Sequence, residues 1–224
     1  MAPSSVIARR LARWALTTLA LAVLVFLPAG KLDLPALWAF LAICSVLALA
    51  AIASIDPDLA RERRRPGPGG FDRASPPLIG LLLLATAVIA SLDVGRLSGS
   101  DTVPLPLRVA GLACFGLGMA LSVWSMAVNR FFSSVVRIQS ERGHHLITAG
   151  PYRWVRHPGY AGMLLACLGA PLGIGSWYGL IPAAGCAAMV LRRAALEDPF
   201  LIEKLDGYAA YAARVRYRLL PGVW

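Results

Sequence analysis

The chain has 224 residues, of which 58% are apolar and only 15% are charged. Soluble domains average about 45–50% apolar and about 25% charged residues, and a soluble core of this size could not bury so much apolar surface. The composition therefore excludes a disordered chain, a collagen-like chain and a small disulfide-bonded scaffold. It indicates an integral membrane protein, and we expect membrane lipids around it.

Five apolar regions follow one another along the chain, and we expect them to form membrane-spanning helices. Four are single spans, at residues 14–27, 35–55, 77–92 and 105–128. The fifth, residues 160–191, is too long for one crossing of about 20 residues. The turn-forming run Gly169–Ser176 divides it and predicts a hairpin of two short helices. The expected fold is an all-α, polytopic membrane helical bundle with about six transmembrane helices; five crossings and a re-entrant segment is the alternative.

The basic residues are distributed unevenly between the two sides that these spans define. The chain carries 22 Lys and Arg residues against 12 Asp and Glu residues, a net charge of +10. With the N-terminus in the cytoplasm, all cations except Lys31, Arg96 and Arg108 fall on cytoplasmic segments, as the positive-inside rule requires. Topology thus explains the charge without a nucleic acid partner. We expect both termini in the cytoplasm and, without an organelle signal, a bacterial inner membrane.

The first span has a second interpretation. It follows Arg9, Arg10 and Arg13, and a basic stretch before an apolar run is also typical of signal peptides. No clean small-x-small cleavage site follows the run. We therefore favour a retained helix over a cleaved signal.

Neither the cysteines nor the histidines show the spacing of metal ligands. The four cysteines lie inside apolar stretches without a Cys-x2-Cys pair, so we interpret them as small core residues. All three histidines lie within residues 144–157, without an HxxxH pair or a carboxylate at fixed spacing. We therefore expect no metal site.

Two of the cytoplasmic segments differ in character. Residues 56–76 are basic and rich in Pro and Gly, which indicates a linker that sets topology and contacts anionic lipid. Residues 129–159 form a long polar segment that holds every histidine. Its Tyr, Trp and Arg residues fit an interfacial belt that anchors the next helix, and they equally fit a ligand site.

A second group of charged and polar residues follows the last span. Arg193 and Glu197 are four residues apart and share one helical face. They are either a surface ion pair or the lining of a cavity where the helix leaves the bilayer. Beyond them, residues 204–218 mix Tyr and Val with Arg at helical spacing, which predicts an amphipathic, interfacial C-terminal helix on the inner leaflet.

Two motifs in this half resemble those of the isoprenylcysteine carboxyl methyltransferase family, which overlaps with the membrane phospholipid methyltransferases. Residues 150–162 read Gly-Pro-Tyr-x3-Arg-His-Pro-x-Tyr-x-Gly. An Arg then precedes Glu-Asp-x2-Leu at 197–201, followed by Gly-Tyr-x2-Tyr at 207–211 and Arg-x2-Pro at 218–221. The resemblance covers residues 129–224, the expected catalytic region, and leaves residues 1–128 as an N-terminal unit of four spans.

The resemblance implies an enzyme that uses S-adenosylmethionine without a Rossmann domain, and the sequence has no strand followed by GxGxxG. The implied acceptor is a lipophilic small molecule or a prenylated substrate from the bilayer, foremost an isoprenylcysteine-like carboxylate. A phospholipid amine, or another lipid or thiol, is an alternative acceptor. A non-enzymatic scaffold or transporter is the alternative of another class.

Carried over by position, the resemblance also implies a site on the cytoplasmic side. Arg193, or Arg192 in its place, would bind the acceptor carboxylate, and Glu197 would bind the ammonium group or ribose of the donor. The implied cofactor pocket consists of Gln139, His144, His145, Leu146, Ile147, Tyr152, His157, Pro158, Gly159, Tyr160 and Glu197. One position departs from the family, since Asp198 stands where the family usually has Glu.

Overall fold

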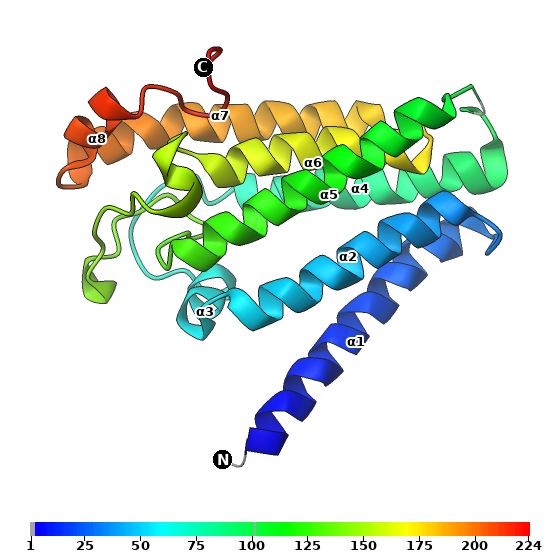
Figure 1. Cartoon of the computed structure of the whole chain (residues 1–224), viewed down its shortest axis with the longest axis horizontal. Helices are drawn as coiled ribbons and strands as arrows, with labels where there is room; N and C mark the ends of the chain where they lie inside the picture. Colours follow the sequence, from blue (N-terminus) through cyan, green and yellow to red (C-terminus); the bar gives the residue numbers. More distant parts are fainter. Residues whose placement is uncertain (1–2, 101) are drawn as a thin grey trace.

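The structure is a computed structural model that describes residues 3–100 and 102–224 (Figure 1). Its α-helices are α1 (Pro3–Ala29), α2 (Pro35–Ser54), α3 (Pro57–Arg64), α4 (Ser75–Leu92), α5 (Leu105–Val128), α6 (Pro158–Ile174), α7 (Leu180–Lys204) and α8 (Tyr208–Arg214). Single turns of other helix types lie at Asp93–Leu97, Ser140–Arg142 and Gly150–Arg153. The all-α fold is therefore confirmed.

The four predicted single spans are confirmed as helices. By length and composition α1, α2, α4 and α5 are each able to cross a membrane, and α6 is a shorter apolar helix. The long helices run up and down in chain order, so that successive helices are antiparallel (Figure 1). α1 begins before its apolar region and carries Arg9, Arg10 and Arg13 within the helix.

The hairpin predicted for residues 160–191 is present, but its turn lies later than expected. α6 continues to Ile174, and Gly175 ends it in the left-handed region at φ +102°. The earlier glycines serve helix packing instead of a turn. A Cβ atom at Gly169 would lie 2.7 Å from the carbonyl oxygen of Gly111 on α5, and a Cβ at Gly118 would lie 2.4 Å from that of Gly162. Small residues therefore let α5 and α6 approach closely.

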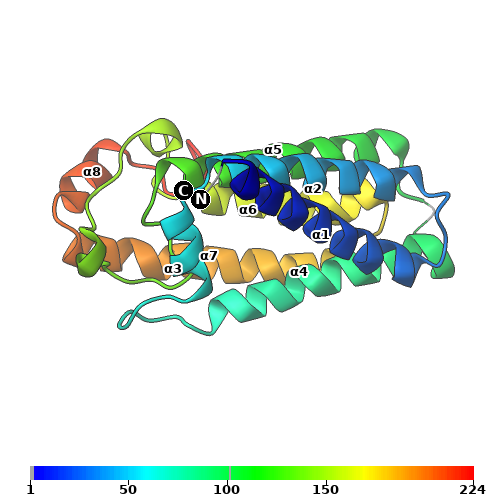
Figure 2. The ribbon, with the colours of Figure 1, turned by 90° about the horizontal axis from the view of Figure 1, so that it is seen from below.

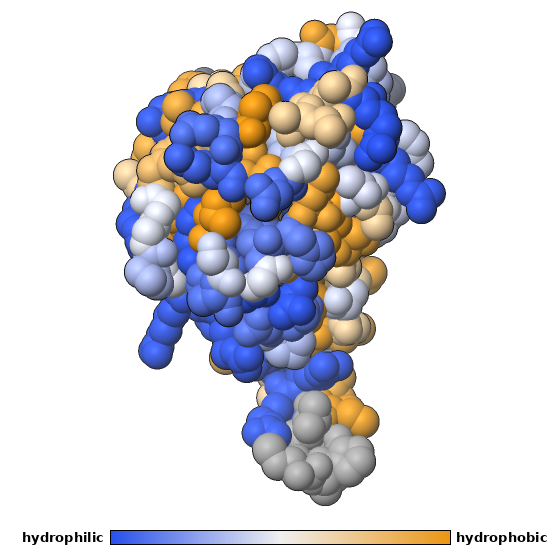
Figure 3. All heavy atoms as spheres, turned by 90° about the vertical axis from the view of Figure 1, so that its left-hand side faces the viewer, coloured by the Kyte–Doolittle hydropathy of each residue, from blue (hydrophilic) through white to orange (hydrophobic). Residues whose placement is uncertain are grey.

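The polar segments gather at one end of the bundle. α3, the 129–157 loop, α8 and the C-terminus lie there together (Figures 1 and 2). Figure 3 looks onto this end and shows hydrophilic residues over much of it. Lys31, Arg96 and Arg108 belong to the opposite end, where Arg96 Nε donates to the carbonyl of Pro28 at 2.6 Å. The separation of the cations along the bundle matches the charge distribution predicted from the spans.

A buried carboxylate closes the opposite end. Asp93 is fully buried between the α4–α5 loop and the α6–α7 turn. Its Oδ2 accepts a hydrogen bond from Ser176 Oγ at 2.5 Å and another from Ser100, and its Oδ1 accepts from the backbone N–H of Gly99 at 3.1 Å. Among the described residues its partners are two hydroxyls and one backbone N–H, so the side chain ties two loops together.

The amphipathic tail is shorter than predicted and packs on protein. α8 has 7 residues, and Tyr208 and Tyr211 are 3% and 2% exposed. They form a cluster with Leu205 and Val215, against which Ile138 and Leu146 of the 129–157 loop pack. The buried face of α8 therefore packs on the loop, and the position of this helix on the inner leaflet stays a prediction.

Candidate active site

The 150–162 motif forms the turn that leads into α6. Gly150 adopts φ +57°, and Pro158 occupies the first turn of α6, where its missing N–H costs nothing. The backbone N–H groups of Arg156 and His157 donate to the carbonyls of Tyr217 and Arg218 at 2.9 and 2.8 Å. The C-terminal tail thus fixes the backbone of the motif.

A cavity of about 70 Å³ opens beside this turn. It lies between the 129–147 loop, the start of α6, the end of α7, and α8. Eight of the predicted pocket residues line it: His144, His145, Leu146, Ile147, Tyr152, His157, Tyr160 and Glu197. The sequence therefore located the cavity from the motif and from the preceding loop.

Three predicted pocket residues support the wall from behind. Gln139 is fully buried, and its Nε2 donates to the carbonyl of Phe131 at 2.7 Å. Gly159 leaves room for Phe132, since a Cβ there would lie 2.4 Å from that ring. Pro158 faces a separate apolar groove. Gln139 and Gly159 therefore set the positions of two aromatic rings that do line the cavity.

Other lining residues escaped the sequence reasoning. They are Asn129, Phe131, Phe132, Ser133, Val135, Val136, Arg137, Arg156, Leu201, Leu205, Tyr208 and Tyr211. The tyrosines had a signal, since both belong to the Gly-Tyr-x2-Tyr motif, and Tyr211 donates from its hydroxyl to the carbonyl of Tyr152 at 2.7 Å. No sequence signal pointed to Phe131 and Phe132 beyond their place in the polar segment of residues 129–159.

Asp198 is the hub of the site. Arg156 binds it with two parallel hydrogen bonds of 2.8 Å, Arg218 Nε donates to it at 2.9 Å, and Tyr208 OH donates at 3.0 Å. His157 Nε2 lies 3.1 Å from Oδ1. Burial opposes ionisation, yet the hydrogen bonds from His157 and Arg156 hold the pKa of Asp198 well below its usual range. The aspartate in place of the family's usual Glu therefore joins α7, the motif turn and the tail.

Glu197 and Arg193 are joined through a tyrosine. Tyr160 OH donates to Glu197 Oε2 at 2.5 Å, and Arg193 Nε donates to the same hydroxyl at 2.6 Å. Arg193 is 4% exposed, also donates to the carbonyl of Ser134 at 2.6 Å, and is not among the residues that line the cavity. Glu197 does line it. Neither side chain is therefore part of an exposed surface pair.

Arg192 points away from the cavity. Its NH1 donates to Asp72 Oδ1 at 3.0 Å and to Ser75 Oγ at 3.2 Å. These contacts attach α7 to the start of α4. Of the two adjacent arginines, Arg193 therefore lies nearer to the predicted site.

His144 is held as a neutral ring. The backbone N–H of Gln139 donates to its Nδ1 at 3.2 Å, and Phe131 stacks on it at 4.6 Å between ring centroids. Burial and then the charges of His145 and nearby arginines lower the pKa of His144 to about 4. With Nδ1 as acceptor, the neutral imidazole carries its proton on Nε2 and offers a donor at the cavity.

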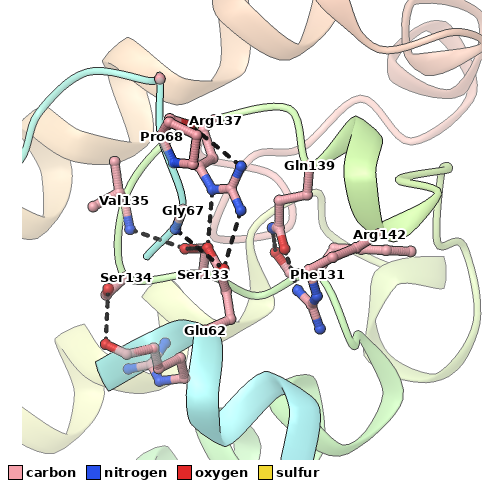
Figure 4. A network of polar contacts seen from close by, with 12 residues as sticks. Glu62, Gly67, Pro68, Phe131, Ser133, Ser134, Val135, Arg137, Gln139 and Arg142 are labelled. Carbon is pink, nitrogen blue, oxygen red and sulfur yellow. Dashed lines mark hydrogen bonds and ion pairs between the residues drawn. The ribbon is translucent and has the colours of Figure 1, made fainter. Parts of the chain in front are cut away.

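The linker of residues 56–76 takes part in the site, which its composition did not reveal. Glu62 on α3 accepts from Arg137 Nε and NH2 at 2.9 and 3.0 Å and from Ser133 Oγ at 2.8 Å (Figure 4). Ser134 Oγ donates to the backbone carbonyl of Arg63 at 3.0 Å. The earlier interpretation as a segment for topology and lipid contact is therefore incomplete, because α3 anchors the loop that forms one wall.

A separate apolar groove of about 710 Å³ runs along α5, α6 and α7. Seven leucines of the three helices line it, together with Leu219 and Leu220 of the tail. Pro151, Val155 and Pro158 also line the groove, whereas their neighbours Tyr152, Arg156 and His157 line the cavity. The motif segment is therefore a thin wall between an apolar groove and a polar cavity.

The charges in the cavity suit a cationic ligand. Arg137 pairs with Glu62 and Glu141, and Arg156 pairs with Asp198. Within the described part of the chain, Glu197 makes its hydrogen bond to a neutral hydroxyl and forms no direct ion pair. It is thus the carboxylate available to a ligand. Aromatic rings beside it add faces that attract a cation.

Comparison with known proteins gives two findings. The sequence model of the family described as "Phospholipid methyltransferase" matches residues 107–206. Two curated relatives, from Oryza sativa subsp. indica and subsp. japonica, are each named "Probable protein-S-isoprenylcysteine O-methyltransferase". Each is 48% identical over 44 residues, which cover 20% of this chain and 23% of the relative. The chain thus matches about a quarter of the length of these relatives.

Proposed function

We propose that this chain, whose residues 107–206 match the phospholipid methyltransferase family, transfers a methyl group from S-adenosylmethionine to a lipophilic acceptor in the membrane. The observation that carries the proposal is Glu197. It is a carboxylate on an aromatic-lined cavity whose neighbouring arginines are already paired. The same cavity is built from both motifs that resemble the methyltransferases.

The residues of the cavity fit the donor. S-adenosylmethionine supplies an electrophilic methyl group on a positively charged sulfur. Glu197 would bind its ammonium group or ribose, and Tyr152 and Tyr160 would place aromatic faces near positive charge. His144 offers an N–H donor from a neutral ring, which adds no competing charge. Asp198 keeps the motif turn in place while the donor binds.

The apolar groove supports a lipophilic acceptor. An acyl or prenyl chain would lie along α5, α6 and α7, with its polar end at the motif segment that separates groove from cavity. Burying an apolar chain contributes about 0.8 kcal/mol per CH₂. The bound acyl or prenyl chain would fix the position of the acceptor group relative to the methyl donor, so most of the rate enhancement would come from positioning. The surrounding apolar residues would exclude water from an anionic nucleophile.

A carboxylate is the first candidate for the acceptor group, in accord with the printed name of the rice relatives. Arg193, or Arg192 in its place, would bind it. Arg193 would then exchange its bond to Tyr160 or to the carbonyl of Ser134 for the acceptor. Its planar guanidinium makes paired hydrogen bonds to a carboxylate and stays charged.

An amine is the second candidate, and one observation favours it. The guanidinium groups of Arg137, Arg156 and Arg193 all have protein partners. A cavity with an available carboxylate and paired arginines accommodates a phospholipid amine without rearrangement. The amine nitrogen would form a bond to the methyl carbon as the bond from that carbon to the donor sulfur breaks, which releases S-adenosylhomocysteine and one proton per methyl group.

An acceptor screen tests the proposal. Purified protein in detergent would receive radiolabelled S-adenosylmethionine with either an S-prenylated cysteine analogue or phosphatidylethanolamine. Label in a base-labile ester without proton release identifies the carboxylate, and stable label with one proton per methyl identifies the amine. Transfer to neither acceptor, together with no binding of the donor, contradicts the proposed function.

We also propose that the site faces the cytoplasm of a bacterial cell, with both termini on that side. The charge distribution supports this, since the α3 and α8 end of the bundle carries nearly all the cations. Arg65→Cys, at an exposed position, would be labelled by an impermeant thiol reagent only after the cells are opened. Labelling in intact cells would contradict the orientation.

A further inference from the structure

Asp72 is an outlier in both backbone and side chain. It adopts φ +60°, a conformation that residues other than Gly rarely take. Its side chain is 5% exposed. Oδ1 accepts hydrogen bonds from Ser75 at 2.5 Å and from Arg192 at 3.0 Å, but Oδ2 is buried without a hydrogen-bond partner. A positive φ and a buried oxygen without a hydrogen bond both cost free energy, and such features persist where the surrounding structure requires the residue.

The unpartnered oxygen faces the start of a relay that ends in the cavity. Asp72 Oδ2 lies 3.8 Å from Arg193 NH1. Arg193 Nε donates to Tyr160 OH at 2.6 Å, and that hydroxyl donates to Glu197 Oε2 at 2.5 Å. Asp72, Arg193 and Tyr160 therefore connect the linker to the carboxylate of Glu197, which lines the cavity.

The position of Asp72 is fixed relative to the cavity wall. The backbone N–H of the preceding residue, Phe71, donates to the carbonyl of Val136 at 3.0 Å. Val136 lines the cavity. The Phe71 ring also meets Phe200 on α7 edge-on, at 5.1 Å between centroids. The linker is thus held between the loop and α7 at the point where Asp72 meets Arg193.

Arg193 has two carboxylates within its reach. Glu197 lies one helical turn further along α7, at the i,i+4 spacing at which ion pairs form on helices. Arg193 instead lies nearest to Asp72 and approaches Glu197 only through Tyr160. Asp72 is therefore the carboxylate nearest to the Arg193 guanidinium, which also donates to Tyr160 OH and to the carbonyl of Ser134.

We propose that Asp72 is a positioning residue for methyl transfer: by holding Arg193, it leaves Glu197 available to the cationic donor. This inference rests on the proposed function. It assigns a role in the donor site to the 56–76 linker, which lies outside the residues that match the family. Asp72 itself touches neither donor nor acceptor and acts through Arg193 and Tyr160.

Donor binding to a small set of variants tests the relay. The ligand is S-adenosylhomocysteine, which does not turn over, titrated into full-length protein in detergent. Asp72→Asn frees Arg193 to pair with Glu197, so the Kd should rise about fivefold or more, within the usual range of coupling between sites. In turnover assays the KM for the donor should rise while kcat stays within about twofold. Asp72→Glu keeps the charge and should restore most of the affinity.

A double variant separates the relay from a loss of structure. In Asp72→Asn/Arg193→Gln the competing cation is gone, so the Kd should return to that of Arg193→Gln alone. Asp33→Asn, an exposed aspartate at the other end of the bundle, is the matched control and should bind as wild type does. Thermal unfolding of every variant shows which of them are folded.

Each outcome is decisive. A wild-type Kd in Asp72→Asn overturns the relay while the proposed function stands. Losses that add in the double variant also overturn it, because they indicate an ordinary structural contact. If wild type binds no donor, the proposed function fails and this inference falls with it.

Discussion

Two fully buried carboxylates stand at opposite ends of this bundle, and their partners differ in kind. Asp93 is bound by two serine hydroxyls and one backbone N–H. Asp198 is bound by two arginines, a histidine and a tyrosine hydroxyl. Both are 0% exposed, so burial alone does not distinguish a closed turn from a functional site.

The partners explain what each carboxylate does. Asp93 joins two neighbouring loops through neutral partners, the hydroxyls of Ser100 and Ser176 and the backbone N–H of Gly99. Asp198 draws cations from the motif turn and from the C-terminal tail, two segments far apart in sequence, and holds them beside a cavity. In this bundle, the carboxylate with cationic partners therefore holds the walls of the candidate site, whereas the one with hydroxyl partners closes a turn.

The largest effect is expected from Asp198→Asn. Removing the charge leaves the buried Arg156 guanidinium without its counter-ion, and breaking a buried pair typically costs about 3–5 kcal/mol. The free energy of unfolding should fall by that order, and donor binding should be lost because the motif turn is released. Thermal unfolding and calorimetry in detergent measure both. Wild-type values in this variant would contradict the role of Asp198 as hub.

The matching change at the other end, Asp93→Asn, should be milder. It weakens charge-assisted hydrogen bonds from Ser100, Ser176 and Gly99 without leaving a buried cation, at a cost of about 1–3 kcal/mol. Donor affinity should stay at the wild-type value, since the cavity lies at the far end. Weakened donor binding in a folded Asp93→Asn protein would show that the two ends are coupled.

Acidification should act on the cavity end in two separate steps. A histidine with a lowered pKa favours the folded state at neutral pH, and this contribution is lost as the pH falls from about 6.5 to about 4 for His144. Asp198, with a pKa held below its usual range, loses its contribution only below about pH 4. His144→Gln should therefore remove the first step of an unfolding profile and keep the second. A profile unchanged by His144→Gln would show that its ring does not titrate in this window.

The sequence predicted those parts of the fold that depend on local pattern. Apolar length identified the spans, and the resemblance carried over by position led to eight of the lining residues. Glycine was ambiguous, because Gly169 fits both a turn and a close helix contact, and only the neighbouring Gly111 decides between them. Amphipathic spacing in the tail was ambiguous too, since it does not say whether lipid or protein covers the apolar face.

Contacts between segments far apart in the sequence could not be predicted. Glu62 and Arg137 are 75 residues apart, and Asp72 and Arg192 are 120 residues apart. Nothing in the local sequence of the 56–76 linker distinguishes an anchor for the cavity loop from a solvated basic loop. The departure at Asp198 proved informative, because the tertiary structure turns that position into a junction between three segments.

Donor binding by Glu197→Gln tests the central claim most directly. The change keeps the shape and the hydrogen bond to Tyr160 but removes the charge. Loss of one charge-assisted hydrogen bond should weaken binding by about 1.5–3 kcal/mol, roughly a tenfold or greater rise in Kd. Glu203→Gln, on the same helix with its side chain 68% exposed, is the matched control and should bind as wild type does. Equal affinities for wild type, Glu197→Gln and Glu203→Gln would contradict the assignment of this cavity to the methyl donor.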